Sequence, residues 1–206
     1  MKQEKTILGI LLTAVVILLM LVACAKPYHF YVKYDFPESS VALKGHKVNL
    51  QILDGRDSKN FLSEKASNEF DMWDGKFALY HTPKKPEGEV QTYPLTGLIE
   101  AAMKKRLQTM GITVVQEKLD NVPLFQLTLN KSSLDLDDRT WISDFSYEVK
   151  LTRDNQKTGR EKVSGQAERT KVMGRGAGEI LMGDIFTESI NKLNIEKLFT
   201  NAGIEL

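Results

Sequence analysis

The feature that most constrains this chain is a single apolar run close to its start. Residues 6–22 carry no charged side chain and are almost wholly apolar, and Lys2 and Lys5 precede them. A basic start, an apolar run and a small residue before the cleavage point, here Ala23, are the parts of a secretory signal peptide. At about 17 residues the run is also near the short limit for a membrane-spanning helix, which is the alternative. We therefore predict that residues 1–23 form a signal peptide rather than a membrane-spanning helix.

The residues around the expected cleavage point resemble a lipobox, the cleavage motif of bacterial lipoproteins. They read Leu21-Val22-Ala23-Cys24, and Cys24 is the only cysteine in the chain. The resemblance implies cleavage before Cys24, a diacylglycerol thioether on its sulfur and acylation of the new amino terminus. Two or more acyl chains anchor a protein stably, whereas one binds only reversibly. With a single cysteine, no disulfide can form within the remaining chain.

The residue after Cys24 indicates which membrane would hold the lipid anchor. It is Ala25 and not Asp. By resemblance to the sorting signals of Gram-negative bacteria, this predicts an anchor in the outer membrane with the domain facing the periplasm.

Size and charge narrow the classes of protein that the remaining chain can belong to. Removing residues 1–23 leaves 183 residues with 26 basic and 26 acidic side chains. That length suits one domain. The balanced charge argues against a nucleic-acid partner, because proteins that bind nucleic acids usually carry an excess of basic side chains. We expect residues 24–46 to form a lipid-anchored tether and residues 47–206 to form a single periplasmic domain. We also expect a chain that begins near Glu38 to fold without lipid.

The expected tether has a regular pattern of its own. From Tyr28 to Phe36, aromatic and aliphatic residues alternate with more polar ones. Strict alternation over nine residues is typical of a strand. We favour an extended segment laid against the domain over an aromatic patch or docking strand.

From residue 47 onward the pattern predicts seven elements in the order β-α-β-β-β-β-α. The strands are expected at 47–54, 112–115, 124–129, 141–152 and 160–172, and the helices at 94–110 and 178–193, with a shorter piece at 195–199. Strands with one apolar and one polar face are typical of antiparallel sheets. The fold class is therefore α+β, a mainly antiparallel sheet with two amphipathic helices on one face. Residues 58–93 are expected as a long connection with a short hairpin at 76–80.

Site chemistry is sparse. The chain's three histidines, His29, His46 and His81, are scattered and show no metal-ligand spacing, so we expect no metal and no cofactor. We interpret the acidic run at residues 135–138 as a solvated turn, since it lacks the spacing of a calcium loop. Residues 174–179 are glycine-rich and precede a helix, but no phosphate-loop lysine follows, so we favour a flexible turn. We find no catalytic motif and predict a protein that is not an enzyme.

The most informative charges end the first expected strand. Asp54, Arg56 and Asp57 follow it directly, around Gly55. Such a group can hold a turn together or bind a ligand, and a structural ion pair is the more common case. We therefore take Asp54, Arg56 and Asp57 as a candidate structural or binding cluster.

Taken together, these features resemble a known family. A lipobox, a short tether, a strand ending in Asp54-Gly55-Arg56-Asp57, a helix ending at Gly111, three antiparallel strands and a terminal helix look like the YajG-like lipoproteins. More distantly the layout is similar to the ABC-transport auxiliary and LptE-like envelope lipoproteins. The resemblance implies a non-enzymatic accessory protein that binds another component of the cell envelope, with a membrane contact through lipidated Cys24. The alternative is a periplasmic hydrolase or a small-ligand-binding lipoprotein.

Overall fold

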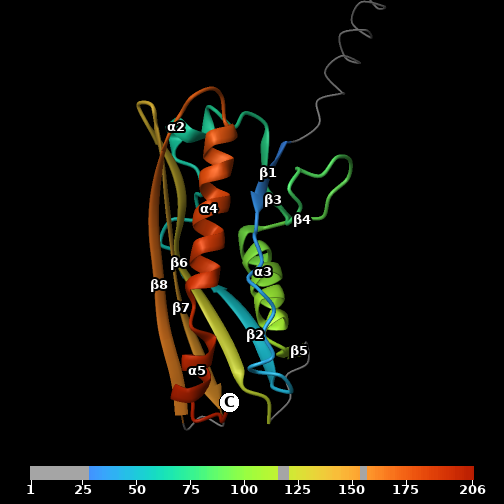
Figure 1. Ribbon diagram of the computed structural model, residues 1–206. Helices are drawn as coiled ribbons and strands as arrows, with labels where there is room; N and C mark the ends of the chain where they lie inside the picture. Colours follow the sequence, from blue (N-terminus) through green and yellow to red (C-terminus); the bar gives the residue numbers. More distant parts are fainter. Residues whose placement is uncertain (1–27, 116–120, 154–156) are drawn as a thin grey trace, which may run out of the picture.

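The computed structural model describes residues 28–115, 121–153 and 157–206, so the expected signal peptide and Cys24 lie outside the described residues. Within these ranges, no helix is long and apolar enough to cross a membrane. The molecule is elongated, and its two long helices, α3 and α4, lie side by side along one face of a large sheet (Figure 1).

The large sheet has five strands in the order β5-β2-β6-β7-β8. Its strands are β2 (Lys47–Asp54), β5 (Thr113–Val115), β6 (Leu124–Asp137), β7 (Thr140–Arg153) and β8 (Lys157–Thr170), and the helices that follow or connect them are α3 (Leu95–Thr109), α4 (Gly176–Lys192) and α5 (Ile195–Asn201). Strand β2 runs parallel to both β5 and β6, and the other pairs are antiparallel. The seven expected elements are all present in the expected order, and the α+β class is confirmed.

A second, smaller sheet was not expected. It contains β1 (Tyr28–Lys33), β3 (Trp73–Tyr80) and β4 (Thr92–Tyr93). A short helix, α2 (Glu64–Ser67), precedes β3 in the 58–93 connection. Strand β3 pairs in parallel with β1 and antiparallel with β4. The hairpin expected at residues 76–80 is therefore wrong, because these residues belong to one continuous strand.

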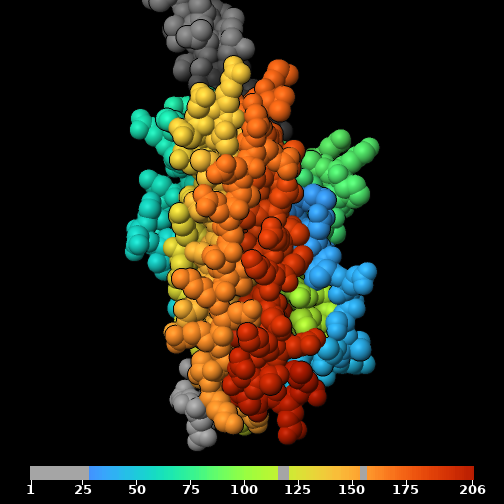
Figure 2. All heavy atoms as spheres, turned by 60° about the vertical axis from the view of Figure 1, so that its left-hand side comes forward, coloured from blue at the N-terminus to red at the C-terminus, as the bar shows by residue number. Residues whose placement is uncertain are grey.

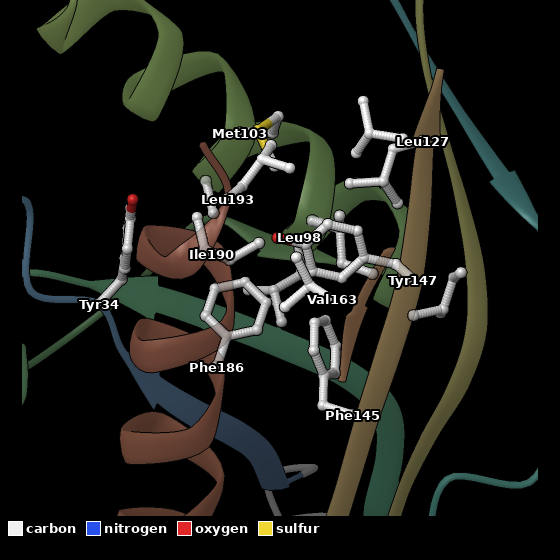
Figure 3. Close-up of a cluster of buried hydrophobic side chains, with 14 of the residues drawn as sticks. Tyr34, Leu98, Met103, Leu127, Phe145, Tyr147, Val163, Phe186, Ile190 and Leu193 are labelled. Atoms are coloured by element: carbon white, nitrogen blue, oxygen red, sulfur yellow. The ribbon is translucent and has the colours of Figure 1, made fainter. Parts of the chain in front are cut away.

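The core lies between the large sheet and the two long helices. Alternate residues of β7 point inward and are fully buried, among them Phe145, Tyr147 and Val149. Phe186 of α4 meets Phe145 edge to face, with ring centroids 5.6 Å apart (Figure 3). The outward residues of the same strand are polar or charged, with the exception of Ile142. The alternation that predicted β7 therefore also indicates which face of this strand is buried against the helices.

Strand β6 extends beyond the expected residues 124–129 to Asp137, because a bulge interrupts the alternation on which the prediction was based. The register with β7 shifts between Leu129 and Lys131. One extra residue moves every following side chain to the opposite face, so Leu129 and Leu134 are both buried although they are five residues apart. Asp135 and Asp137 consequently lie in the strand, and only Asp138, with φ of 51°, stands at the turn into β7. The prediction of a solvated turn at 135–138 was wrong for its first three residues.

The segment expected as a tether contributes to the core. Phe30, Val32 and Tyr34 are fully buried and belong to the same hydrophobic cluster as the sheet residues. The Tyr34 hydroxyl donates to Asn191 Oδ1 at 2.9 Å, which joins this segment to the end of α4. The predicted strand is confirmed, and its aromatic side faces inward. The division of the chain at residue 47 stays a prediction.

Candidate functional site

The sequence-predicted cluster forms a compact turn at the end of β2. Arg56 donates from Nε and Nη2 to the two carboxylate oxygens of Asp54, each at 3.0 Å, and Lys59 Nζ lies 3.1 Å from Asp54 Oδ1. Arg56 is 8% exposed. Because of these donors, above all Arg56, the pKa of the Asp54 carboxyl is held well below its usual range. The structure thus brings Asp54 and Arg56 together as an ion pair.

Gly55 lets this turn approach β6 closely. Its N–H donates to the Leu129 carbonyl at 2.9 Å, and a Cβ at this position would lie 2.8 Å from Thr128 Cγ2. A side chain here would push the turn away from the strand. The dipeptide Gly55-Arg56 therefore places the guanidinium over β6, where Nη1 donates to the Ser132 carbonyl at 3.4 Å.

Beyond this turn the edge of β6 is interrupted. The chain returns to the edge at residues 61–63, where Leu134 N donates to the Phe61 carbonyl at 2.7 Å and Ser63 N donates to the Leu134 carbonyl at 3.1 Å. Between the contacts at Leu129 and Leu134, the chain bows away from residues 130–133. A cleft of about 620 Å³ opens along this gap. That volume lies within the range of ligand-binding sites.

Most of the residues that line the cleft are polar, and they include more acids than bases. Four carboxylates line it, those of Asp57, Glu64, Asp135 and Asp144, against the two cations Arg56 and Lys131. Both cations already have carboxylate partners, since Lys131 Nζ lies 2.9 Å from Asp144 Oδ2 and Arg56 is bound by Asp54. Asp57 is exposed, and within the described residues it forms no ion pair with Arg56. The cleft therefore suits a neutral or basic ligand.

Catalytic chemistry finds little support in this arrangement. A general acid or base works best with a pKa near the working pH, and the pKa of Asp54 is shifted in the opposite direction. Among the described residues, no group of three or more His, Cys, Asp or Glu side chains is placed to hold a metal ion. The histidines lie apart, with His29 beside Asp74, His46 against Phe199 and His81 against Phe36.

A second polar cluster escaped the sequence analysis. Glu179, in the first turn of α4, accepts hydrogen bonds from the Tyr28 hydroxyl and, at 3.0 Å, from Tyr31 N. Lys85 Nζ lies 3.3 Å from Glu179 Oε2 and 3.8 Å from the centre of the Tyr31 ring. Burial, reinforced by Glu179, raises the pKa of the Tyr28 hydroxyl far above its usual value. Glu179 lies 94 or more positions from Lys85, Tyr31 and Tyr28, so no local pattern links them and only the folded structure reveals this cluster.

Comparisons with known proteins give resemblances of shape alone. No protein-family model matches the chain, and no curated protein matches it. Among solved structures, a Xanthomonas campestris protein of the DUF330 family is 12% identical, covers 83% of this chain and 94% of its own length, and has a TM-score of 0.46. The rare lipoprotein B of Shewanella oneidensis is 12% identical, covers 71% and 89%, and has a TM-score of 0.39.

A third solved structure is a Helicobacter pylori protein described as a neuraminyllactose-binding hemagglutinin homolog. It is 12% identical, covers 86% of this chain and 100% of its own length, and has a TM-score of 0.44. At this identity and these TM-scores, the resemblances determine neither the family nor the function of the chain. Membership of the YajG-like family therefore stays a prediction.

Proposed function

We propose that this protein is a lipid-anchored protein of the bacterial cell envelope, held through Cys24, which binds a segment of another envelope component in the cleft beside Arg56 and catalyses no reaction. The anchor rests on the lipobox-like residues 21–24. Because Ala25 and not Asp follows Cys24, we further propose that the anchor lies in the outer membrane and that the domain faces the periplasm.

The interrupted edge of β6 is the observation that carries the binding proposal. Strand edges offer backbone donors and acceptors to an extended peptide, so such binding needs no special side chains. Here the edge is capped on both sides, by Gly55 at Leu129 and by Phe61 at Leu134. We infer that a short segment of a partner occupies the gap between them, beside the exposed Lys131, and uses backbone groups other than the Ser132 carbonyl, which already accepts from Arg56. Capping of the flanks also limits uncontrolled pairing of the edge with other chains.

Charge indicates the kind of segment that the cleft accepts. Asp57, Glu64 and Asp135 line the cleft without an ion-pair partner among the described residues. A segment with Lys or Arg side chains would pair with them, whereas an acidic segment would be repelled. We therefore infer a neutral to basic peptide.

Binding of a small ligand is the second candidate, because a buried guanidinium is a common anchor for a carboxylate or phosphate. Arg56 lines the cleft, yet its Nε and Nη2 atoms are already taken by Asp54. The orientation of Arg56 therefore favours a structural role, and the peptide proposal ranks first.

Site-specific photo-crosslinking in living cells tests the proposal. A photoreactive residue at Asn60, in the cleft, should link to one partner, and mass spectrometry should map the link to a neutral or basic segment. The matched control is Thr158, an exposed residue at the beginning of β8, which is the end of this strand away from the cleft. Equal linking from both positions, or a link from neither, would contradict the binding site.

A synthetic copy of the mapped segment gives a quantitative second step. The double variant Asp57→Asn and Glu64→Gln should weaken binding about tenfold, since each exposed charge contributes about 0.5–1 kcal/mol. Glu196→Gln, on the exposed side of α5, is the control and should leave the affinity unchanged. Turnover of esters, phosphoesters or peptidoglycan fragments that depends on Arg56 would support the hydrolase alternative instead.

A further inference from the structure

Exposed apolar side chains gather at one end of the molecule. The described residues include seven large hydrophobic side chains that are exposed, and four of these are Met72 (51% exposed), Val172 (84%), Met173 (87%) and Ile180 (52%). Val172 and Met173 belong to the loop between β8 and α4, and this loop lies at the upper end of the molecule in Figure 1 and, in Figure 2, among the orange atoms at the top. Solvent-exposed apolar residues in such a group often mark a contact surface.

Tyr28, the first described residue, lies within this group. Its N–H donates to the Met72 carbonyl at 3.1 Å, and its ring lies 3.5 Å below the Arg175 guanidinium. Its hydroxyl is bound by Glu179, which precedes Ile180. The described part of the chain therefore begins beside Met72 and the first turn of α4, which carries Ile180.

The end is packed well enough to hold its shape. The Phe70 ring lies 6.2 Å from the Tyr28 ring and 5.5 Å from the Trp141 ring, and Gly178 lies so close that a Cβ would meet Trp141 at 3.1 Å. Lys171 Nζ is 2.5 Å from Glu69 Oε1, which ties the exposed loop to the α2 region. The exposed apolar side chains at this end therefore stand beside a packed aromatic cluster and an ion pair.

We propose that this end of the domain, formed by residues 171–175 and Met72, rests in the headgroup region of the membrane that carries the Cys24 anchor. The proposal depends on lipidation of Cys24, which is part of the proposed function. Three residues separate Cys24 from Tyr28, and the four residue steps between them span at most about 14 Å. A lipid on Cys24 would therefore bring Tyr28 and its apolar neighbours to the bilayer surface.

The composition of this end suits a shallow contact with lipid headgroups. Aromatic, Lys and Arg side chains favour the membrane interface because they combine an apolar body with a polar tip. Four side chains here are of this kind: Lys85 lies over the Tyr31 ring, and Arg175 lies over the Tyr28 ring. Exposed Asp71 precedes Met72, and exposed Asp138 precedes Arg139, whose carbonyl accepts a hydrogen bond from Lys171 N; the charges of these two acids oppose deeper insertion. The expected result is a domain that stands on its end, with the cleft accessible from the side.

Fluorescence of the full lipidated protein in vesicles tests this contact. The protein is reconstituted in vesicles of phosphatidylethanolamine and phosphatidylglycerol in a ratio of about 3:1. An environment-sensitive fluorophore is attached in the variant Met173→Cys. Because the thioether blocks Cys24, the label reacts at the new cysteine alone. Lys197→Cys, on exposed α5 at the opposite end, is the matched control.

The label at residue 173 should shift its emission to the blue and be quenched by lipids that carry a shallow nitroxide, whereas the label at 197 should report water. Water-like emission at both sites in protein with a lipidated Cys24 would overturn this contact and leave the anchor intact. Protein whose mass shows no lipid would instead overturn the anchor and the contact together. The mass of the reconstituted protein separates the two failures.

Discussion

Arg56 and Asp54 face each other in a two-pronged ion pair, with Nε and Nη2 each 3.0 Å from a carboxylate oxygen. Arg56 is buried, and Asp54 keeps a quarter of its side chain exposed. The pair also fixes the loop that forms one wall of the cleft. Its geometry makes Arg56 the structural centre of the candidate site.

Loss of this pair should lower the free energy of unfolding. Arg56→Ala would leave Asp54 partly buried beside Lys59 alone, and we expect a loss of about 2–3 kcal/mol, measured by urea unfolding. Arg56→Lys should restore only part of it, because an ammonium cannot bind both oxygens in the same way. Lys131→Ala removes an exposed pair with Asp144 and should cost under about 1 kcal/mol. Equal losses for Arg56→Ala and Lys131→Ala would contradict a structural role for Arg56.

Acid should weaken the protein partly through Asp54. Its pKa is lower in the folded state than the value of about 3.9 expected in the unfolded chain. The ionised carboxyl therefore stabilises the fold above about pH 4, and this contribution disappears as the pH falls below that value. The variant Asp54→Asn should be less stable at pH 7 and should lose less stability than the wild type between pH 5 and pH 2. Unfolding free energies measured across that range give the comparison, and parallel curves would contradict it.

The sequence predicted the elements whose pattern is local. Strand β7 has an unbroken alternation of polar and apolar residues from Asp144 to Thr152, and helix α3 has an apolar stripe that ends near Gly111, whose φ of 84° favours glycine. The Asp54–Arg56 pair was also accessible, because its members are two residues apart. Local spacing determines these features, and no distant contact is needed to form them.

The sequence analysis missed features that depend on distant contacts. The bulge after Leu129 reverses the alternation of β6, so its second half no longer resembles the first. Strand β3 exists because β1 pairs with it in parallel across more than 40 residues. Likewise, the Ser132 carbonyl that receives Arg56 lies 76 residues further along the chain. No local pattern contains these pairings, and the cleft depends on two of them.

Two glycine substitutions should have opposite effects, because Gly159 lies in the contact between β8 and α5 whereas Gly176 has open space around it. A Cβ at Gly159 would lie 2.2 Å from the Leu198 carbonyl oxygen, so Gly159→Ala should move α5 off the sheet and cost about 2–4 kcal/mol. Gly176, at the start of α4, has nothing within 4 Å of its built Cβ. Gly176→Ala should be neutral or stabilising by up to about 1 kcal/mol. Thermal melting of both variants tests this, and a tolerated Gly159→Ala would contradict the packing.

Burial of the β1 segment changes the expectation for a shortened chain. A protein that begins at Glu38 lacks Phe30, Val32 and Tyr34, each fully buried, and leaves β3 without its parallel partner. Loss of one such aromatic side chain alone costs about 3–5 kcal/mol. We now expect this chain to lose cooperative unfolding, while one that begins at Ala25 should keep it. Circular dichroism during heating distinguishes them, and matching transitions would show that β1 is dispensable.

The intact mass of the protein extracted from its native membranes tests the central claim most directly. The account predicts a chain of residues 24–206 whose first residue, Cys24, carries the added mass of a diacylglycerol and an amino-terminal acyl group. The variant Cys24→Ser should remain an uncleaved chain without lipid. A wild-type mass equal to the unmodified 206 residues, or a Cys24→Ser variant that is cleaved and retained like the wild type, would contradict the lipid anchor.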